Sequence, residues 1–376
     1  MFCGCKPGAP PNVDPVTRPV RAATAALAAA LLMSACAAEA PEPPAETAVE
    51  SDDRPARSQG VLVDGVADGQ PGCSAAVGVE GAVVWAGARG LADIATGADL
   101  TTDTAFDIAS VSKQFTATAV LLLVDRHQLA LDDTLATHVA GLPPWAAGVT
   151  IGQLMHQTSG IPDYMGLLED AGFTLTDRTT NADTLRALGA VTELDFEPGT
   201  EFEYSNSNYV LLAEIVERTA RQPLSAFLSA RIFWPLELDM VLDPAAPVPG
   251  AAVPDTGADG EFTPARTAWL QVGDGSIQTA PSQLVRWADN YRTGEVGGRT
   301  LLDAQLAGAV ETGDGDRYGA GIYEYANGAL GHDGAWGGFV TDFRIDRDRR
   351  TSVAVSCNSD TQDPSALADA LARIWG

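Results

Sequence analysis

Strand-like patterns at the two ends of the chain constrain the fold more than any other feature of this sequence. Near the start, residues 73–79 and 82–90 alternate in polarity around a turn at Gly81. Near the end, residues 331–345 and 351–357 have the pattern of a second strand pair. Helical periodicity fills the region between the two pairs. We therefore expect one antiparallel sheet in which the first and last strands of the chain meet.

The helical segments complete the predicted architecture. Apolar residues recur at helical spacing over 111–128, 208–221, 223–234 and 364–375. No internal repeat is visible. The sequence therefore predicts an α/β protein of the α+β type, with an antiparallel sheet built from N- and C-terminal strands, flanking helices and a mostly helical inserted subdomain. We expect one composite domain over residues 59–376.

We expect an export signal within residues 1–35, because residues 18–36 have the pattern of one. Arg18 and Arg21 form a charged start, and the apolar run over 22–33 is too short to span a bilayer. Residues 1–15 do not resemble the start of a signal. We therefore expect translation to begin downstream of them, near Val16 or Val20.

A cysteine follows this signal. The segment Met33-Ser34-Ala35-Cys36 resembles a bacterial lipobox, in which Cys36 would be lipidated and become the mature N-terminus; ordinary cleavage near Ala38 is the alternative. Residues 36–58 are rich in Pro, Ala and Glu and lack hydrophobic periodicity, which is typical of an extended tether. We expect an exported protein of the cell envelope, held as a lipoprotein in the periplasm or on the outer cell surface.

Charge and cysteine content limit the partners. Fifty acidic residues against 23 basic ones give a net charge of −27, which disfavours nucleic acid and anionic lipid, so a lipid on Cys36 is the one expected membrane contact. The four histidines and the available cysteines have no metal-ligand spacing, and we expect neither metal nor cofactor. Cys73 and Cys357 could form a disulfide in an oxidising compartment or remain two free, buried thiols.

Beyond Cys36 the chain contains a single lysine, Lys113, three residues after Ser110. Ser110 lies where a helix is expected to begin, so a helix cap is one interpretation of it. A lysine in the first turn faces the positive end of the helix dipole, and this field together with burial lowers the pKa of its ammonium. The spacing of three places both side chains on one helix face. The pair is therefore a candidate nucleophile with its base.

Two further stretches contain candidate site residues. Tyr204-Ser205-Asn206 precedes the helix expected from residue 208, where it could supply a hydrophobic staple and a cap, or a proton donor and an amide for a substrate carbonyl. His332-Asp333-Gly334 approaches a glycine-rich stretch that also contains Ala335 and Trp336. Glycine beside a strand edge indicates a turn or bulge, or lets a substrate approach the backbone.

Taken in order, Ser-x-x-Lys, Tyr-x-Asn and His-x-Gly resemble the motifs of class C β-lactamase-related serine hydrolases. This penicillin-binding-protein-like family includes DD-carboxypeptidases, D-aminopeptidases and β-lactamase-fold esterases. Segments 129–133, 151–164 and 196–206 also resemble the family, and the resemblance covers about residues 60–376. It implies a β-lactamase/transpeptidase-like fold.

The resemblance implies a role for each matching residue. Ser110 would be acylated, with Lys113 or Tyr204 as its base, while Asn206 orients the substrate. The N–H groups of Ser110 and Ala335 would form an oxyanion hole. Around them, Gly334 would give access to the strand edge, His332 would meet a substrate carboxylate, and Trp336 would form an aromatic wall.

We therefore expect an exported serine hydrolase that cleaves an ester or a D-amino-acid amide through an acyl-enzyme, on a small-molecule or peptidoglycan-derived substrate. One alternative is a catalytically silent peptidoglycan-binding protein on the same fold, and another is a weak β-lactamase. Class C β-lactamases usually have Lys-Thr-Gly at the third motif. His332-Asp333-Gly334 in its place argues against efficient β-lactam hydrolysis.

Overall fold

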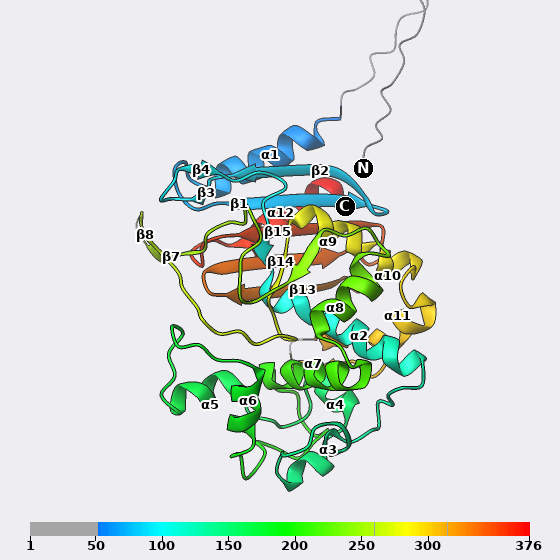
Figure 1. The fold of residues 1–376 in the computed structure, drawn as a ribbon. Coiled ribbons are helices and arrows are strands. Elements are labelled where there is room, and N and C mark those ends of the chain that lie inside the picture. Colours follow the sequence, from blue (N-terminus) through cyan, green and yellow to red (C-terminus); the bar gives the residue numbers. More distant parts are fainter. Residues whose placement is uncertain (1–51, 259, 314) are drawn as a thin grey trace, which may run out of the picture. The chain divides into compact units, whose positions relative to one another are not determined.

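The computed structural model describes residues 52–258, 260–313 and 315–376 (Figure 1). The export signal expected over 1–35, the lipidation site at Cys36 and the tether up to residue 51 lie outside the described residues. Within the described ranges, no helix has the length and apolar character needed to cross a membrane.

An eight-stranded antiparallel sheet forms the centre of the fold (Figure 1). The predicted meeting of the two chain ends is confirmed, because the first strand pairs with the last one from Cys73 opposite Cys357 to Val79 opposite Thr351. The strands lie in the order β10 (Val310–Glu311), β11 (Arg317–Tyr318), β12 (Tyr323–Glu324), β13 (Leu330–Trp336), β14 (Phe339–Ile345), β15 (Thr351–Cys357), β1 (Cys73–Val79) and β2 (Ala82–Arg89).

The segment 331–345, expected as one strand, is a hairpin of two strands. β13 ends at Trp336, β14 begins opposite it at Phe339, and Gly337 and Gly338 form the turn between them with φ of 54° and 90°. Both turn residues need positive φ, which glycine adopts without steric cost. β13 lies against the 3₁₀ turn over Ala109–Ser112, where the candidate site lies.

The sheet is covered on both faces, and alternate residues of β1 point to different cores. Ala75 and Val77 pack in one cluster with α12 (Pro364–Trp375) and α1 (Arg54–Gly65). Ala76 packs in the main cluster on the opposite face.

Helix α1 corrects one predicted boundary, because residues 54–58, expected as the end of the tether, form its first turns. Pro55 stands at the start of the helix, where its missing N–H costs nothing. Ser58 is buried and accepts a hydrogen bond of 2.8 Å from Trp375 Nε1 of α12. The expected tether residues are thus part of the folded domain.

The main cluster contains the helices predicted between the two strand pairs, whereas the one predicted over 364–375 is α12 in the other cluster. The helix expected over 111–128 is α2 (Lys113–Asp125), preceded by one 3₁₀ turn over Ala109–Ser112, and the helix expected from residue 208 is α7 (Asn206–Ala220). Other helices of this region are α3 (Leu135–His138), α4 (Ile151–Met155), α5 (Tyr164–Asp170), α6 (Asn181–Leu188), α8 (Leu224–Leu228), α9 (Pro281–Ala288), α10 (Asn290–Thr293) and α11 (Gly298–Leu306). Helices α3 to α7 gather at the end of the fold away from β2, as the expected helical subdomain (Figure 1).

Short strands connect these parts. They are β3 (Leu91–Asp93) with β4 (Ala98–Asp99), β7 (Asp255–Ala258) with β8 (Glu261–Pro264), and the three-stranded group of β5 (Phe106–Asp107), β9 (Ile277–Thr279) and β6 (Met240–Leu242). The pairing of β5 with β9 is important for the site, because Ser110 follows the first strand and Asp274 precedes the second.

The structure has Cys73 and Cys357 joined by a disulfide. They face each other on adjacent central strands with a Cα–Cα distance of 4.0 Å, and both are fully buried. Of the two states left open by the sequence, this structure contains the bonded one.

Candidate active site

A sharp turn presents Ser110 at the start of α2. Ala109, which precedes it, has φ of 47°, a conformation that is uncommon for a residue with a side chain. Its N–H donates a 2.8 Å hydrogen bond to Asp107 Oδ1, which holds the turn. The N-cap position of α2 is Ser112, so Ser110 does not act as the helix cap. Such local strain often accompanies functional residues.

Lys113 Nζ uses its three donor positions on three different parts of the fold. It donates to Ser110 Oγ at 2.9 Å, to Asn206 Oδ1 at 2.8 Å and to the backbone oxygen of Asp274 at 2.8 Å. The side chain is fully buried. Burial lowers the pKa of Lys113 to about 8, while the nearby carboxylates of Asp274 and Asp163 act in the opposite direction. A neutral amine in this position could accept the Ser110 proton.

Asn206 is oriented from the far side by Asp163. One carboxylate oxygen of Asp163 accepts 2.8 Å hydrogen bonds from both the backbone N and the Nδ2 of Asn206. The other oxygen accepts from Met165 N and so caps α5. Because Asn206 Nδ2 is held by this carboxylate, its Oδ1 must point toward Lys113.

Tyr204 contributes a buried ring and hydroxyl beside this pair. Lys113 Nζ lies 5.0 Å from the centre of the Tyr204 ring. The phenol oxygen is buried, and although Ser110 is near enough to affect its pKa, the two side chains form no hydrogen bond of normal geometry. Burial raises the pKa of Tyr204 well above its usual value of 10. The phenol therefore keeps its proton at neutral pH.

His332 does not lie where the resemblance implied. It is 2% exposed, and its Nε2 lies 3.2 Å from Tyr318 Oη, within a cluster of aromatic rings that includes Tyr204 and Tyr323. Burial, with Lys113 nearby, lowers the pKa of His332 to about 4, so the imidazole is neutral. In this structure it can offer no charge to a substrate carboxylate.

The end of β13 lies against the backbone of Ser110, and Gly334 permits this approach. A Cβ at Gly334 would lie 2.5 Å from the Ile108 oxygen and 3.0 Å from Ser110 N. Ala335 follows, and both Ala335 and Ser110 line the same pocket. In an antiparallel ladder every second residue directs its N–H away from its partner strand. Ala335 is one residue from the closing pair Trp336–Phe339, so its N–H can face the pocket beside Ser110 N.

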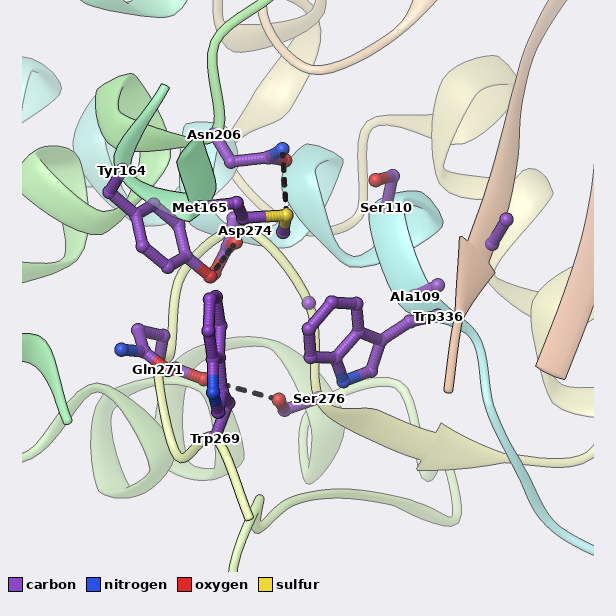
Figure 2. Close-up of a pocket in the computed structure, with 12 residues that line it drawn as sticks. Ala109, Ser110, Tyr164, Met165, Asn206, Trp269, Gln271, Asp274, Ser276 and Trp336 are labelled. Atoms are coloured by element: carbon purple, nitrogen blue, oxygen red, sulfur yellow. Dashed lines mark hydrogen bonds between the residues drawn. The ribbon is translucent and has the colours of Figure 1, made fainter. Parts of the chain in front are cut away.

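The pocket at Ser110 has one polar and one aromatic side. Figure 2 shows the rings of Tyr164, Trp269 and Trp336 below Ser110 and Asn206. The ring centres of Trp269 lie 6.0 Å from those of both Tyr164 and Trp336. The remaining lining residues are Ala109, Met165, Gln271, Asp274, Gly275, Ser276 and Ala335.

Several of these residues have no clear signal in the sequence. Tyr164 and Asp163 end the segment 151–164 that resembled the family, which was the one available signal for them. Trp269 and Asp274 lie in a stretch without a readable motif, although Asp274 stands between two glycines. Elsewhere in the described ranges, no three His, Cys, Asp or Glu side chains gather in a way that suits a metal ion.

Several known proteins are similar to this chain over most of its length. The chain is 31% identical over 285 residues to a D-aminopeptidase of Brucella anthropi. The aligned region covers 72% of this chain and 52% of that protein. The chain thus spans about half the length of this relative. A D-aminopeptidase of Cereibacter sphaeroides is 29% identical over 320 residues, 81% of this chain and 60% of its own length.

Solved structures share the fold. The octameric penicillin-binding protein homologue from Pyrococcus abyssi superposes with a TM-score of 0.73 at 25% identity, covering 82% of this chain and 74% of its own. A D-amino acid amidase from Ochrobactrum anthropi SV3 has a TM-score of 0.74 at 22% identity, covering 86% and 99%. The family described as Beta-lactamase matches residues 59–374, nearly the whole described part. The chain belongs to the Beta-lactamase family.

Proposed function

We propose that this protein is a serine hydrolase that cleaves D-amino-acid amides, or esters of similar shape, through an acyl-enzyme on Ser110. The observation that carries the proposal is the position of Lys113 Nζ, which is buried and 2.9 Å from Ser110 Oγ. A serine hydroxyl is a weak nucleophile until a neighbouring base removes its proton. Membership of the Beta-lactamase family and the similarity to D-aminopeptidases support this chemistry.

The acylation step follows from these contacts. Lys113 in its neutral form accepts the Ser110 proton as Ser110 Oγ bonds to the substrate carbonyl carbon. The oxyanion that forms receives hydrogen bonds from the N–H groups of Ser110 and Ala335, each worth about 3–4 kcal/mol in the transition state. The C–N or C–O bond then breaks, and the leaving group takes the proton that Lys113 received from Ser110, passed on through Tyr204. Water cleaves the acyl-enzyme by the same steps in reverse order.

The two candidate bases differ in their pKa. A pKa of about 8 for Lys113 leaves a useful fraction of neutral amine near neutral pH. The pKa of Tyr204 is raised well above 10, which makes a tyrosinate costly. These directions support Lys113 as the base. Tyr204 can pass a proton to the leaving group only if it takes one from protonated Lys113 at the same time, so that no tyrosinate forms.

We also propose that the protein is exported to the cell envelope, by way of the signal-like segment 1–35 and a lipid on Cys36. The bonded pair Cys73–Cys357 supports this, since disulfides persist in oxidising compartments. Mass spectrometry of the membrane fraction tests it. A diacylglyceryl-modified Cys36 peptide is the expected result, and an unmodified N-terminus near residue 38 would contradict the lipid anchor.

A covalent label tests the proposed hydrolase against a silent binding protein. The purified protein is treated with a fluorophosphonate and with a fluorescent penicillin, digested, and the mass of the Ser110 peptide is measured. We expect a phosphonate adduct on Ser110 and none in Ser110→Ala. Labelling by the phosphonate alone favours an esterase, and stable labelling by penicillin favours a peptidase. No adduct with either reagent, with unchanged activity in Ser110→Ala, would refute the proposal.

A further inference from the structure

The pocket beside Ser110 contains a carboxylate that the acylation steps do not use. Asp274 is 6% exposed and lines this pocket. Its Oδ2 accepts a 3.0 Å hydrogen bond from Tyr164 Oη, which fixes the carboxyl group (Figure 2). Lys113 bonds to the backbone oxygen of Asp274 and not to its side chain. When Lys113 is neutral, as acylation requires, this buried carboxylate has no full positive charge beside it.

The surroundings of Asp274 suit a cation. Tyr164, Trp269 and Trp336, which we call the aromatic wall, line the same pocket. Aromatic faces attract ammonium groups, most strongly where water is excluded. Trp269 is 3% exposed and Tyr164 2% exposed, so two of the three rings are shielded from solvent, while Trp336 is partly exposed.

The same pocket has little to offer an anion. Among the described residues that line it there is no arginine, lysine or histidine. Lys113 lies behind Ser110 with all three donor positions occupied. His332 is buried and neutral, and Arg266 is exposed in the adjoining groove. A carboxylate on the acyl part of a substrate would therefore meet the carboxylate of Asp274 instead of a counter-ion.

We propose that Asp274, at the aromatic wall, binds the ammonium group of the substrate's acyl residue and so selects acyl groups with a free amine. This rests on the proposed function, because the acyl group must be the one that Ser110 attacks. When Lys113 loses its proton, Asp274 loses the positive charge near it. The bound ammonium group of the substrate replaces that charge. A substrate with a blocked amine cannot do this, and it leaves a buried charge unpaired.

Matched substrates test the proposal. D-alanine p-nitroanilide and propionyl p-nitroanilide differ only in the ammonium group, and kcat/KM is measured for both. We expect a preference of about 10- to 100-fold for the amine, the range of one hydrogen bond to a charged group. In Asp274→Asn the ratio should fall at least tenfold. Equal kcat/KM for the two substrates in the wild-type protein would overturn the proposal.

The control variant is Asp333→Asn. Asp333 also acts electrostatically on Lys113, but it is exposed and does not line the pocket. The same charge change there should leave the substrate ratio within about twofold. If both variants lower kcat/KM for the two substrates equally, Asp274 affects only Lys113 and the proposal is wrong.

Two further measurements apply if Asp274→Asn does not fold. Tyr164→Phe keeps the ring and removes the hydrogen bond to Asp274, and the ratio should fall severalfold. In the wild-type protein, propylammonium should slow fluorophosphonate labelling of Ser110 at concentrations at which propanol does not. Equal protection by the two compounds contradicts the ammonium site. Failure of the label to react at all contradicts the proposed hydrolase instead, so the two hypotheses fail separately.

Discussion

Replacing Gly334 with alanine tests whether the end of β13 forms one side of an oxyanion hole. The added Cβ would lie 2.5 Å from the Ile108 oxygen and 3.0 Å from Ser110 N. Ordinary van der Waals contact begins at 3.4 Å, so the strand or the Ser110 turn must move by about 0.9 Å. Both contacts are to backbone atoms, which cannot be relieved by a change of rotamer.

That displacement is large compared with the tolerance of the site. A hydrogen bond of about 2.9 Å lengthened by this amount exceeds the usual range for N–H···O bonds. Loss of one oxyanion donor lowers kcat by about 10²- to 10³-fold, and a 1 Å misplacement costs a similar amount. We expect kcat of Gly334→Ala to fall about 100-fold, with a smaller change in KM because ground-state binding does not use the oxyanion contacts.

Gly331→Ala is the matched control. Gly331 lies on the same strand, and a Cβ there would also meet a backbone oxygen at 2.5 Å, that of Phe343 on β14. Each substitution should lower the free energy of unfolding by about 1–3 kcal/mol through overpacking. The assay is steady-state hydrolysis of p-nitrophenyl acetate together with chemical denaturation of both variants. If the two variants lose stability and kcat to the same extent, or Gly334→Ala keeps kcat within threefold, the reasoning fails.

Three other outcomes can be checked independently. Lys113→Arg should be as inactive as Lys113→Ala in ester hydrolysis, because a guanidinium does not release its proton; substantial activity in the arginine variant would exclude Lys113 as the base. Since the working form is the neutral amine and the pKa is about 8, kcat/KM for a neutral ester should rise as pH increases through 8 and then level off, and a decrease between pH 7 and 9 would contradict this. Reduction of the Cys73–Cys357 bond should lower the free energy of unfolding by about 2–5 kcal/mol, measured in denaturant with and without reductant, while a Cys73→Ser/Cys357→Ser double variant should not respond to reductant.

Several parts of the fold could be predicted because their signals are local. β1 and β2 alternate around Gly81, and α12 has a proline at its start and helical spacing throughout. All three elements were predicted within one residue of their bounds. The hairpin of β13 and β14 was missed, although its two adjacent glycines are a known turn signal. Apolar and β-forming residues continue after these glycines, so the local pattern is also compatible with one longer strand.

Site residues that are close together in the sequence could be predicted to meet, and those that are far apart could not. Ser110 and Lys113 are three apart on one helical turn, so their contact follows from backbone geometry. Asp274 is 161 residues from Lys113, and the two meet only because β9 pairs with β5 just before the Ser110 turn. Asp163 and Asn206 are likewise brought together by the packing of α5 against α7.

The surroundings of His332 could not be predicted from the sequence either. Strand alternation predicts that His332 and Gly334 share one face of β13, but it does not say what covers that face. The aromatic rings of Tyr204, Tyr318 and Tyr323 do so and leave the imidazole buried and neutral.

By itself, the sequence determined the strand patterns at the two ends of the chain and the position of Ser110 and Lys113 on one helix face, because both follow from short-range periodicity. Only the tertiary structure decided that Lys113 is fully desolvated, that His332 is withdrawn from the pocket and that Asp274 enters it. Burial and charge balance are sums over neighbours from distant parts of the chain, and no local pattern contains them.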